Sequence, residues 1–312
     1  METIATVSLP IFALVFSGYG AKRLGLLNEA SIAGLNGFVY YFALPALFVV
    51  KVSEAPVVRL FDWRLVAAYQ GAGLGVFGVA MLCGRRLFGQ RVAVLGLQGL
   101  AAAWGNVGYM GPPLVLAAFG NGATLPAATI LAFDIMVPLS LAIAIIEGGL
   151  GGRHRWFEIV RTVAGGLARN PLMLAILAGA VLSAGGLALP APAKAFGTLL
   201  GGAALPCALF ALGASLVGRP IATGKGEVAL LVGLKLLAHP LAVWALVTHV
   251  FALQPLWAKV AVIEAALPTA ANVFVLAQRY DVYADRASAI VFTSTLVSVA
   301  TVSALLALAV GR

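Results

Sequence analysis

Charged side chains are scarce in this sequence. Only 10% of its 312 residues are Asp, Glu, Lys or Arg, whereas soluble domains carry about 25%. So few charges could not cover a soluble surface, because 62% of the residues are hydrophobic. The composition therefore excludes a large soluble domain and predicts an all-α membrane protein that has the lipid bilayer as its surroundings.

Cysteine and histidine are also rare. Cys83 and Cys207 both lie in or beside apolar runs, which excludes a disulfide framework. The three histidines, His154, His239 and His249, show no spacing typical of metal ligands. We therefore expect no metal site and no other cofactor.

Catalytic signatures are missing as well. The sequence has no GxSxG, HExxH or Walker motif and no paired catalytic carboxylates on one helix. Their absence argues against an enzyme and against a pump driven by ATP. The net charge of +9 does not indicate a nucleic-acid partner, because the basic residues lie between apolar runs.

Long apolar runs dominate the chain instead. A membrane-spanning helix needs about 20 mostly apolar residues. Ten runs meet this condition, and the sequence predicts spans near 4–21, 32–50, 64–84, 92–118, 126–147, 170–187, 196–217, 228–251, 257–278 and 286–310.

Basic residues predict the orientation of these spans. With the N-terminus outside, thirteen of the 20 basic residues lie in cytoplasmic segments, six lie outside and Lys235 lies within a helix. This bias favours a multi-pass protein of the cell inner membrane with both termini extracytoplasmic. Lys22 and Arg23 follow the first run, so we expect that run to be retained as a helix rather than cleaved.

A hydrophilic stretch divides the ten spans into two sets of five. We expect a first repeat at 1–150, a cytoplasmic linker at 151–169 with a short amphipathic helix near 156–167, and a second repeat at 170–312. An odd number of spans per repeat makes the second repeat enter the membrane from the opposite side. Inverted repeats of this kind are typical of secondary transporters.

Matching residues support the repeat. Pro10 corresponds to Pro171, the ALP of helix 2 corresponds to the ALP of helix 7, and Asn106 corresponds to Asn272, at offsets of 161, 161 and 166 residues. Three such matches at nearly one offset indicate related halves, which we expect to be two inverted five-helix repeats.

The fourth and ninth spans contain strong helix breakers. In helix 4, Gly111 precedes Pro112 and Pro113, and in helix 9 Pro268 precedes Asn272. Proline removes an amide donor and clashes with the preceding turn. We expect both helices to break, a simple kink being the alternative for helix 4. The freed amides and the two asparagines would then suit a carboxylate.

Ionisable residues inside the spans are few. Asp134 lies well within helix 5, where a charge is costly, so we expect either a proton-coupling role or a structural hydrogen bond. Lys235 and Glu264 lie in helices 8 and 9, and we expect them to form a structural ion pair rather than to contact substrate.

The motifs GNVGYMGPPL in helix 4 and LPTAANVFVLAQRYDV in helix 9 resemble those of the auxin efflux carrier family. This family includes plant PIN-type auxin exporters and bacterial permeases for malate, malonate and similar acids. The resemblance covers nearly the whole chain. Val273 stands where PIN-type carriers have a second proline, and their long central loop is missing, which favours a small carboxylate over auxin.

The resemblance implies a fold like that of bile acid–sodium symporters. Helices 1, 2, 6 and 7 would form a scaffold, and helices 3–5 and 8–10 a mobile transport domain, with helices 4 and 9 crossing at their breaks. It implies elevator-like alternating access and a homodimer through the scaffold. The expected substrate-binding residues are Asn106, Tyr109, Pro113, Asp134, Asn272 and Val273.

The favoured function is therefore secondary transport of small organic anions. A sodium-coupled symporter of bile-acid-like or other organic solutes is the alternative. A channel would need a polar ring lining a pore, and an intramembrane enzyme would need a paired acid or a metal cluster; the sequence indicates neither.

Overall fold

The computed structural model describes residues 9–55, 62–151, 164–166, 168–215, 217 and 224–310, and within them all regular structure is helical. The amphipathic helix expected near 156–167 falls largely outside the described residues. The α-helices are α1 (Leu9–Arg23), α2 (Glu29–Phe38), α3 (Leu44–Ser53), α4 (Trp63–Phe88), α5 (Val92–Ala103), α6 (Gly111–Phe119), α7 (Thr124–Met136), α8 (Pro138–Gly149), α10 (Pro171–Ala184), α11 (Ala191–Gly202), α12 (Ala204–Ser215), α13 (Lys225–Gly233), α14 (His239–Ala245), α15 (Pro255–Ala266), α16 (Asn272–Arg279) and α17 (Ala284–Val310).

Several of these helices join end to end into longer rods. Short π-helical segments, η2 (Val39–Ala43), η5 (Leu234–Ala238) and η6 (Leu246–Val250), connect α2 to α3 and extend α14 at both ends. Two of them directly precede a Pro-containing first turn, at Pro45 and Pro240. Because proline lacks an amide hydrogen, the preceding turn widens instead of ending the helix.

Six of the rods are long and apolar enough to cross a membrane. Within the described residues these are Glu29–Ser53, Trp63–Phe88, Asn121–Gly149, Ala191–Ser215, Lys225–Val250 and Ala284–Ala309. The all-helical membrane character expected from the composition is thus confirmed. Two further apolar helices, α5 and α10, are shorter.

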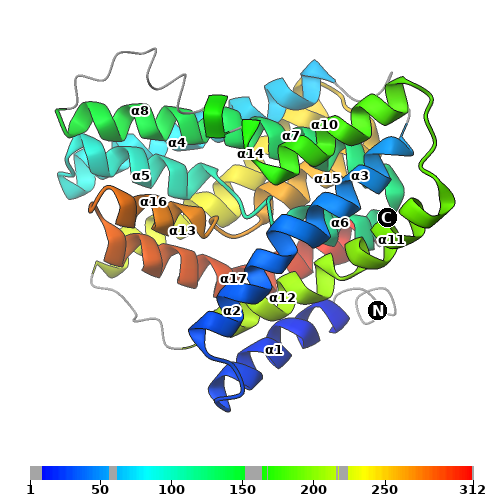
Figure 1. Ribbon diagram of the computed structural model, residues 1–312. Helices are drawn as coiled ribbons and strands as arrows, with labels where there is room; N and C mark the ends of the chain where they lie inside the picture. The colour runs from blue at the N-terminus through cyan, green and yellow to red at the C-terminus, as the bar shows by residue number, and fades with distance from the viewer. Residues whose placement is uncertain are drawn as a thin grey trace.

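One group of helices, along the right side and the bottom of Figure 1, contains α1, α2, α3, α10, α11 and α12. Within it, α1 packs along α12, and α10 and α11 pack along α3. The first of these pairs approaches very closely: a Cβ at Gly213 would overlap the Val15 carbonyl, and a Cβ at Gly18 would overlap that of Phe210. Small residues at such contacts are typical of helix packing in membranes.

The second group extends from the left of Figure 1 past its centre and contains α4, α5 and α8 together with α13–α17. Here α5 lies between α4 and α8, and α13 and α16 both pack against α17. The first turn of α1 and the last turn of α17 lie towards the same side of the molecule (Figure 1).

A buried carboxylate ties one end of the second group together. Glu227, at the start of α13, is 2% exposed and accepts hydrogen bonds from Gln90 Nε2 at 3.0 Å and from the Tyr283 hydroxyl at 2.7 Å. It also accepts a hydrogen bond from Gln98 and forms an ion pair with Arg286. A buried charge is tolerated when it is paired and fully hydrogen-bonded in this way. This hub joins α5, α13 and α17.

Candidate functional site at two helix breaks

The first break separates α5 from α6. Helix α5 ends at Ala103, and Trp104 is extended, with φ −89° and ψ 110°. Helix α6 begins at Gly111, with Pro112 and Pro113 in its first turn. Prolines are well placed there, because amides of a first helical turn have no partner within the helix. The residues between the helices therefore expose backbone groups inside the protein.

The second break separates α15 from α16. Helix α15 ends at Ala266, Leu267 is extended with φ −61° and ψ 151°, and α16 begins at Asn272. A residue that precedes proline is disfavoured in the helical conformation, so Pro268 fixes this end.

The two breaks pair with each other across the molecule. The Asn106 amide donates to the Pro268 carbonyl at 2.8 Å, and the Ala270 amide donates to the Trp104 carbonyl at 3.1 Å. Gly105 and Thr269 face one another as an antiparallel bridge. Backbone polar groups within a membrane must be satisfied by protein. Each break thus provides partners for the other.

Side chains satisfy helix ends beside the crossing. The Thr269 hydroxyl donates to the Ala101 carbonyl in the last turn of α5 at 2.8 Å, and its amide donates to Ser294 Oγ at 3.1 Å. The Lys235 ammonium donates to the Ala265 carbonyl in the last turn of α15 at 2.6 Å. These carbonyls have no partners within their own helices, and a cation is favourable at a helix C-terminus.

A cavity of about 300 Å³ lies against the crossing. Both breaks line it, together with α7, α8, η2 and the start of α10. The described lining residues are Tyr40, Trp104, Gly105, Asn106, Val107, Gly108, Tyr109, Leu131, Ile135, Leu139, Ile143, Gly166, Asn170, Leu172, Ala270, Ala271, Asn272 and Arg279.

Three of the residues expected to bind substrate line this cavity: Asn106, Tyr109 and Asn272. The Tyr109 ring stacks on Tyr40, with 5.5 Å between the ring centroids. Asn272 is the first residue of α16, so the partially positive end of that helix faces the cavity.

The other three expected residues, Pro113, Asp134 and Val273, do not line the cavity in this conformation. Val273 is fully buried. Asp134 is 2% exposed, and its Oδ1 accepts a hydrogen bond from Gln70 Nε2 of α4 at 3.0 Å. The face of α7 and α8 that meets the cavity carries Leu131, Ile135 and Leu139 instead.

Arg279, which ends α16, lines the cavity and was missed among the site residues expected from the sequence. From the sequence, Arg279 is counted only among the thirteen basic residues expected in cytoplasmic segments. Its position seven residues after Asn272 on a short helix is the signal that could have identified it.

Behind the crossing lies a buried polar cluster, which we define as Gln70, Asp134, Lys235, His239 and Glu264. All five side chains are less than 9% exposed. The Lys235 ammonium lies 3.2 Å from His239 Nδ1. Both Glu264 oxygens and Asp134 Oδ2 lack a hydrogen-bonding partner.

The expected ion pair between Lys235 and Glu264 is not made in this conformation. The Lys235 ammonium instead caps the end of α15 through Ala265, and no ion pair between the two is found. The Glu264 carboxylate faces Gly111, where a Cβ would overlap it. The physical reason is the break itself, since the orphan carbonyls of α15 attract the ammonium.

A second cavity, of about 560 Å³, lies between η6, α15 and the end of α17, and its lining includes Trp244, Lys259 and Leu305. It does not touch either break. No group of three or more potential metal ligands occurs in the described part of the chain.

Comparison with known proteins places the chain among membrane transporters. The family described as "Membrane transport protein" matches residues 3–306. A protein named "Putative malonate transporter" from Rhizobium meliloti (strain 1021) is 37% identical over 306 residues, covering 98% of this chain and 96% of that protein.

Two further relatives have names that state no substrate. An uncharacterized transporter from Methanothermobacter thermautotrophicus is 32% identical and covers 93% of each chain. The uncharacterized transporter YfdV of Escherichia coli (strain K12) is 25% identical and covers 92% of each chain. The resemblance noted in the motifs is thereby confirmed: the chain belongs to the membrane transport protein family of auxin efflux carriers, a family of transporters rather than enzymes.

Proposed function

We propose that this protein is a secondary transporter that carries small organic anions, in particular carboxylates, across the cell inner membrane. The observation that carries the proposal is the cavity at the crossing. The cavity is lined by three asparagines (Asn106, Asn170 and Asn272), the N-terminus of α16 and Arg279, and no carboxylate is among the described lining residues. Such a lining attracts an anion and supplies hydrogen bonds to it. The name of the Rhizobium meliloti relative supports a substrate of the malonate type.

The fold proposed for this function has ten spans in two inverted five-helix repeats. The packing supports it: α1 of the first repeat packs along α12 of the second, and α10 of the second packs along α3 of the first. A two-fold axis relating the repeats would exchange these two contacts, because it would bring α1 onto α10 and α12 onto α3. The breaks also fall in the fourth and ninth proposed spans, the corresponding places where transporter sites form.

The two helix groups suggest how the cavity would open alternately to the two sides of the membrane. We assign α1–α3 and α10–α12 to a scaffold, through which a homodimer would form, and α4–α8 and α13–α17 to a transport domain. The cavity lies where the two meet, since Tyr40 and Leu172 come from the scaffold. Elevator-like movement of the transport domain would then expose it to either side. With both termini outside, Asn170 and Arg279 belong to cytoplasmic helix ends, so the cavity that they line would face the cytoplasm in this conformation.

Ion coupling rests on the buried polar cluster. Asp134 Oδ2 and both Glu264 oxygens lack hydrogen-bonding partners. A buried carboxylate requires a proton or a cation. Proton coupling through Asp134 is the favoured candidate, and sodium-coupled symport is the second, because a cation beside Glu264 would satisfy the same need.

Exchange of labelled malonate in proteoliposomes tests the function. Exchange needs no assumption about the direction of transport. We expect saturable exchange by the wild type that is absent from protein-free liposomes. Failure to exchange malonate or any other small carboxylate would refute the proposed function. In a separate measurement, the dependence of net uptake on sodium or on pH would decide between the coupling candidates.

A further inference from the structure

The cavity contains one charged side chain whose role the crossing does not explain. Among the described residues that line the cavity, Arg279 is the only charged one. It makes no ion pair with any described residue. A guanidinium offers donors in a planar fork that matches a carboxylate. The charge is therefore available to a ligand.

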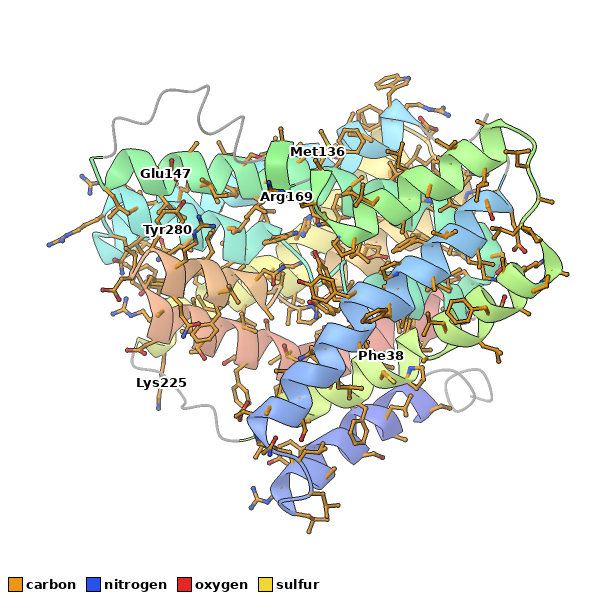
Figure 2. The ribbon with its side chains drawn as sticks, in the orientation of Figure 1. Phe38, Met136, Glu147, Arg169, Lys225 and Tyr280 are labelled. Atoms are coloured by element: carbon orange, nitrogen blue, oxygen red, sulfur yellow. The ribbon has the colours of Figure 1, made fainter. Side chains whose placement is uncertain are left out.

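A purely structural role accounts for only part of this placement. Arg279 lies in the last turn of α16, where a cation is favourable at the helix C-terminus. That effect explains the residue type but not its position in the cavity lining. Glu147 on α8 contacts the residue that follows Arg279, because it accepts a hydrogen bond from the Tyr280 hydroxyl at 2.8 Å (Figure 2). Within the described residues Glu147 makes no ion pair with Arg279.

Helix α16 places two positive poles in one cavity. Its N-terminus at Asn272 carries partial positive charge, and Arg279 carries a full charge seven residues later. Seven residues of α-helix rise about 10 Å, and side chains lean towards the helix N-terminus, which shortens the separation between the poles. A cavity of about 300 Å³ is at the small end of ligand pockets. A short ligand with negative charge at both ends fits this arrangement.

We propose that Arg279 is a specificity-determining residue that binds the second carboxylate of a short aliphatic dicarboxylate. The first carboxylate binds between Asn106 and Asn272 at the start of α16. The inference rests on the proposed transport function and names its substrate class. A monocarboxylate can use only the inner pole, so Arg279 sets the preference for the dianion.

The test compares malonate with malonamate, in which an uncharged amide replaces one carboxylate. Half-saturation constants are measured by exchange in proteoliposomes for the wild type and for Arg279→Gln. A hydrogen-bonded charge pair corresponds to about a tenfold to hundredfold preference for malonate in the wild type. Arg279→Gln should reduce this preference to about threefold or less, because malonate loses a charged partner whereas malonamate loses at most a hydrogen bond to its amide.

Two further variants serve as controls, one for a charge outside the cavity and one for the charge at position 279. Arg86→Gln removes a charge from the exposed end of α4, outside the cavity, and should keep the wild-type preference. Arg279→Lys keeps the charge and should retain a clear part of the preference. Retained malonamate exchange shows that Arg279→Gln is folded; if that variant does not fold, loss of the preference in Arg279→Lys refutes the role of charge.

The outcomes separate the two proposals. If Arg279→Gln prefers malonate as strongly as Arg86→Gln does, Arg279 does not bind the second carboxylate. If the wild type exchanges monocarboxylates but shows no preference for malonate, the dicarboxylate inference fails while the transport function stands. If the wild type exchanges no carboxylate, both fail.

Discussion

The Thr269 hydroxyl offers a direct test of how the crossing is held together. Thr269 is 1% exposed, and its hydroxyl donates to the Ala101 carbonyl across the break at 2.8 Å. Thr269→Val keeps the shape of the side chain and removes only this donor. The buried carbonyl left without a partner should cost about 1–3 kcal/mol. Since the Thr269 amide still donates to Ser294, the loss is confined to the hydroxyl.

A matched control lies nearby in α17. The Thr295 hydroxyl is equally buried and donates to the Val291 carbonyl at 2.7 Å, one turn earlier in the same helix. That carbonyl also accepts a helical amide bond, so Thr295→Val should cost about 0.5 kcal/mol or less. Both variants remove a hydroxyl donor. The Ala101 carbonyl is then left without a partner, whereas the Val291 carbonyl keeps its helical amide partner.

Thermal unfolding in detergent measures the difference. Thr269→Val should melt about 2–6 °C below the wild type, Thr269→Ser should recover most of the loss, and Thr295→Val should melt close to the wild type. If Thr269→Val and Thr295→Val melt alike, the hydroxyl does not stabilise the crossing and the reasoning is wrong.

Three further outcomes are expected. Asn106→Ala and Asn272→Ala should each raise the half-saturation constant for malonate exchange about fivefold or more, because intramembrane hydrogen bonds contribute about 1–2 kcal/mol; wild-type constants in both would place the substrate elsewhere. Asp134→Asn keeps a partner for Gln70 but cannot titrate, so net uptake should lose its pH dependence while exchange persists; wild-type pH dependence would end the proton-carrier role. In a background without Cys83 and Cys207, Asn121→Cys should react with an impermeant thiol reagent from outside, and protection there would reverse the proposed orientation.

The sequence predicts the helices and their interruptions because local chemistry determines both. Apolar runs determine where helices lie, and Pro112, Pro113 and Pro268 remove amide donors wherever they fall. The asparagines that line the cavity follow from the same breaks, since they sit beside freed backbone groups. Each break follows from residues next to it in the chain, although the backbone partners that satisfy it come from the other break.

Side-chain partners could not be predicted in the same way. Lys235 and Glu264 are complementary charges on neighbouring spans, yet Lys235 binds a carbonyl that is free only because α15 ends at Ala266. The direction in which Asp134 points depends on how α7 is rotated against α4, and a helix that is apolar on all sides gives no periodicity to read. In the sequence Arg279 cannot be distinguished from other basic residues near a loop, and only the fold shows that it lines the cavity.

The position of a bound anion tests the central claim most directly. A structure of the protein determined in the presence of malonate should show the ligand in the cavity at the crossing, with one carboxylate at the start of α16 between Asn106 and Asn272. Malonate bound instead in the larger cavity beside Trp244 and Lys259, with the crossing cavity empty, would contradict the proposed site.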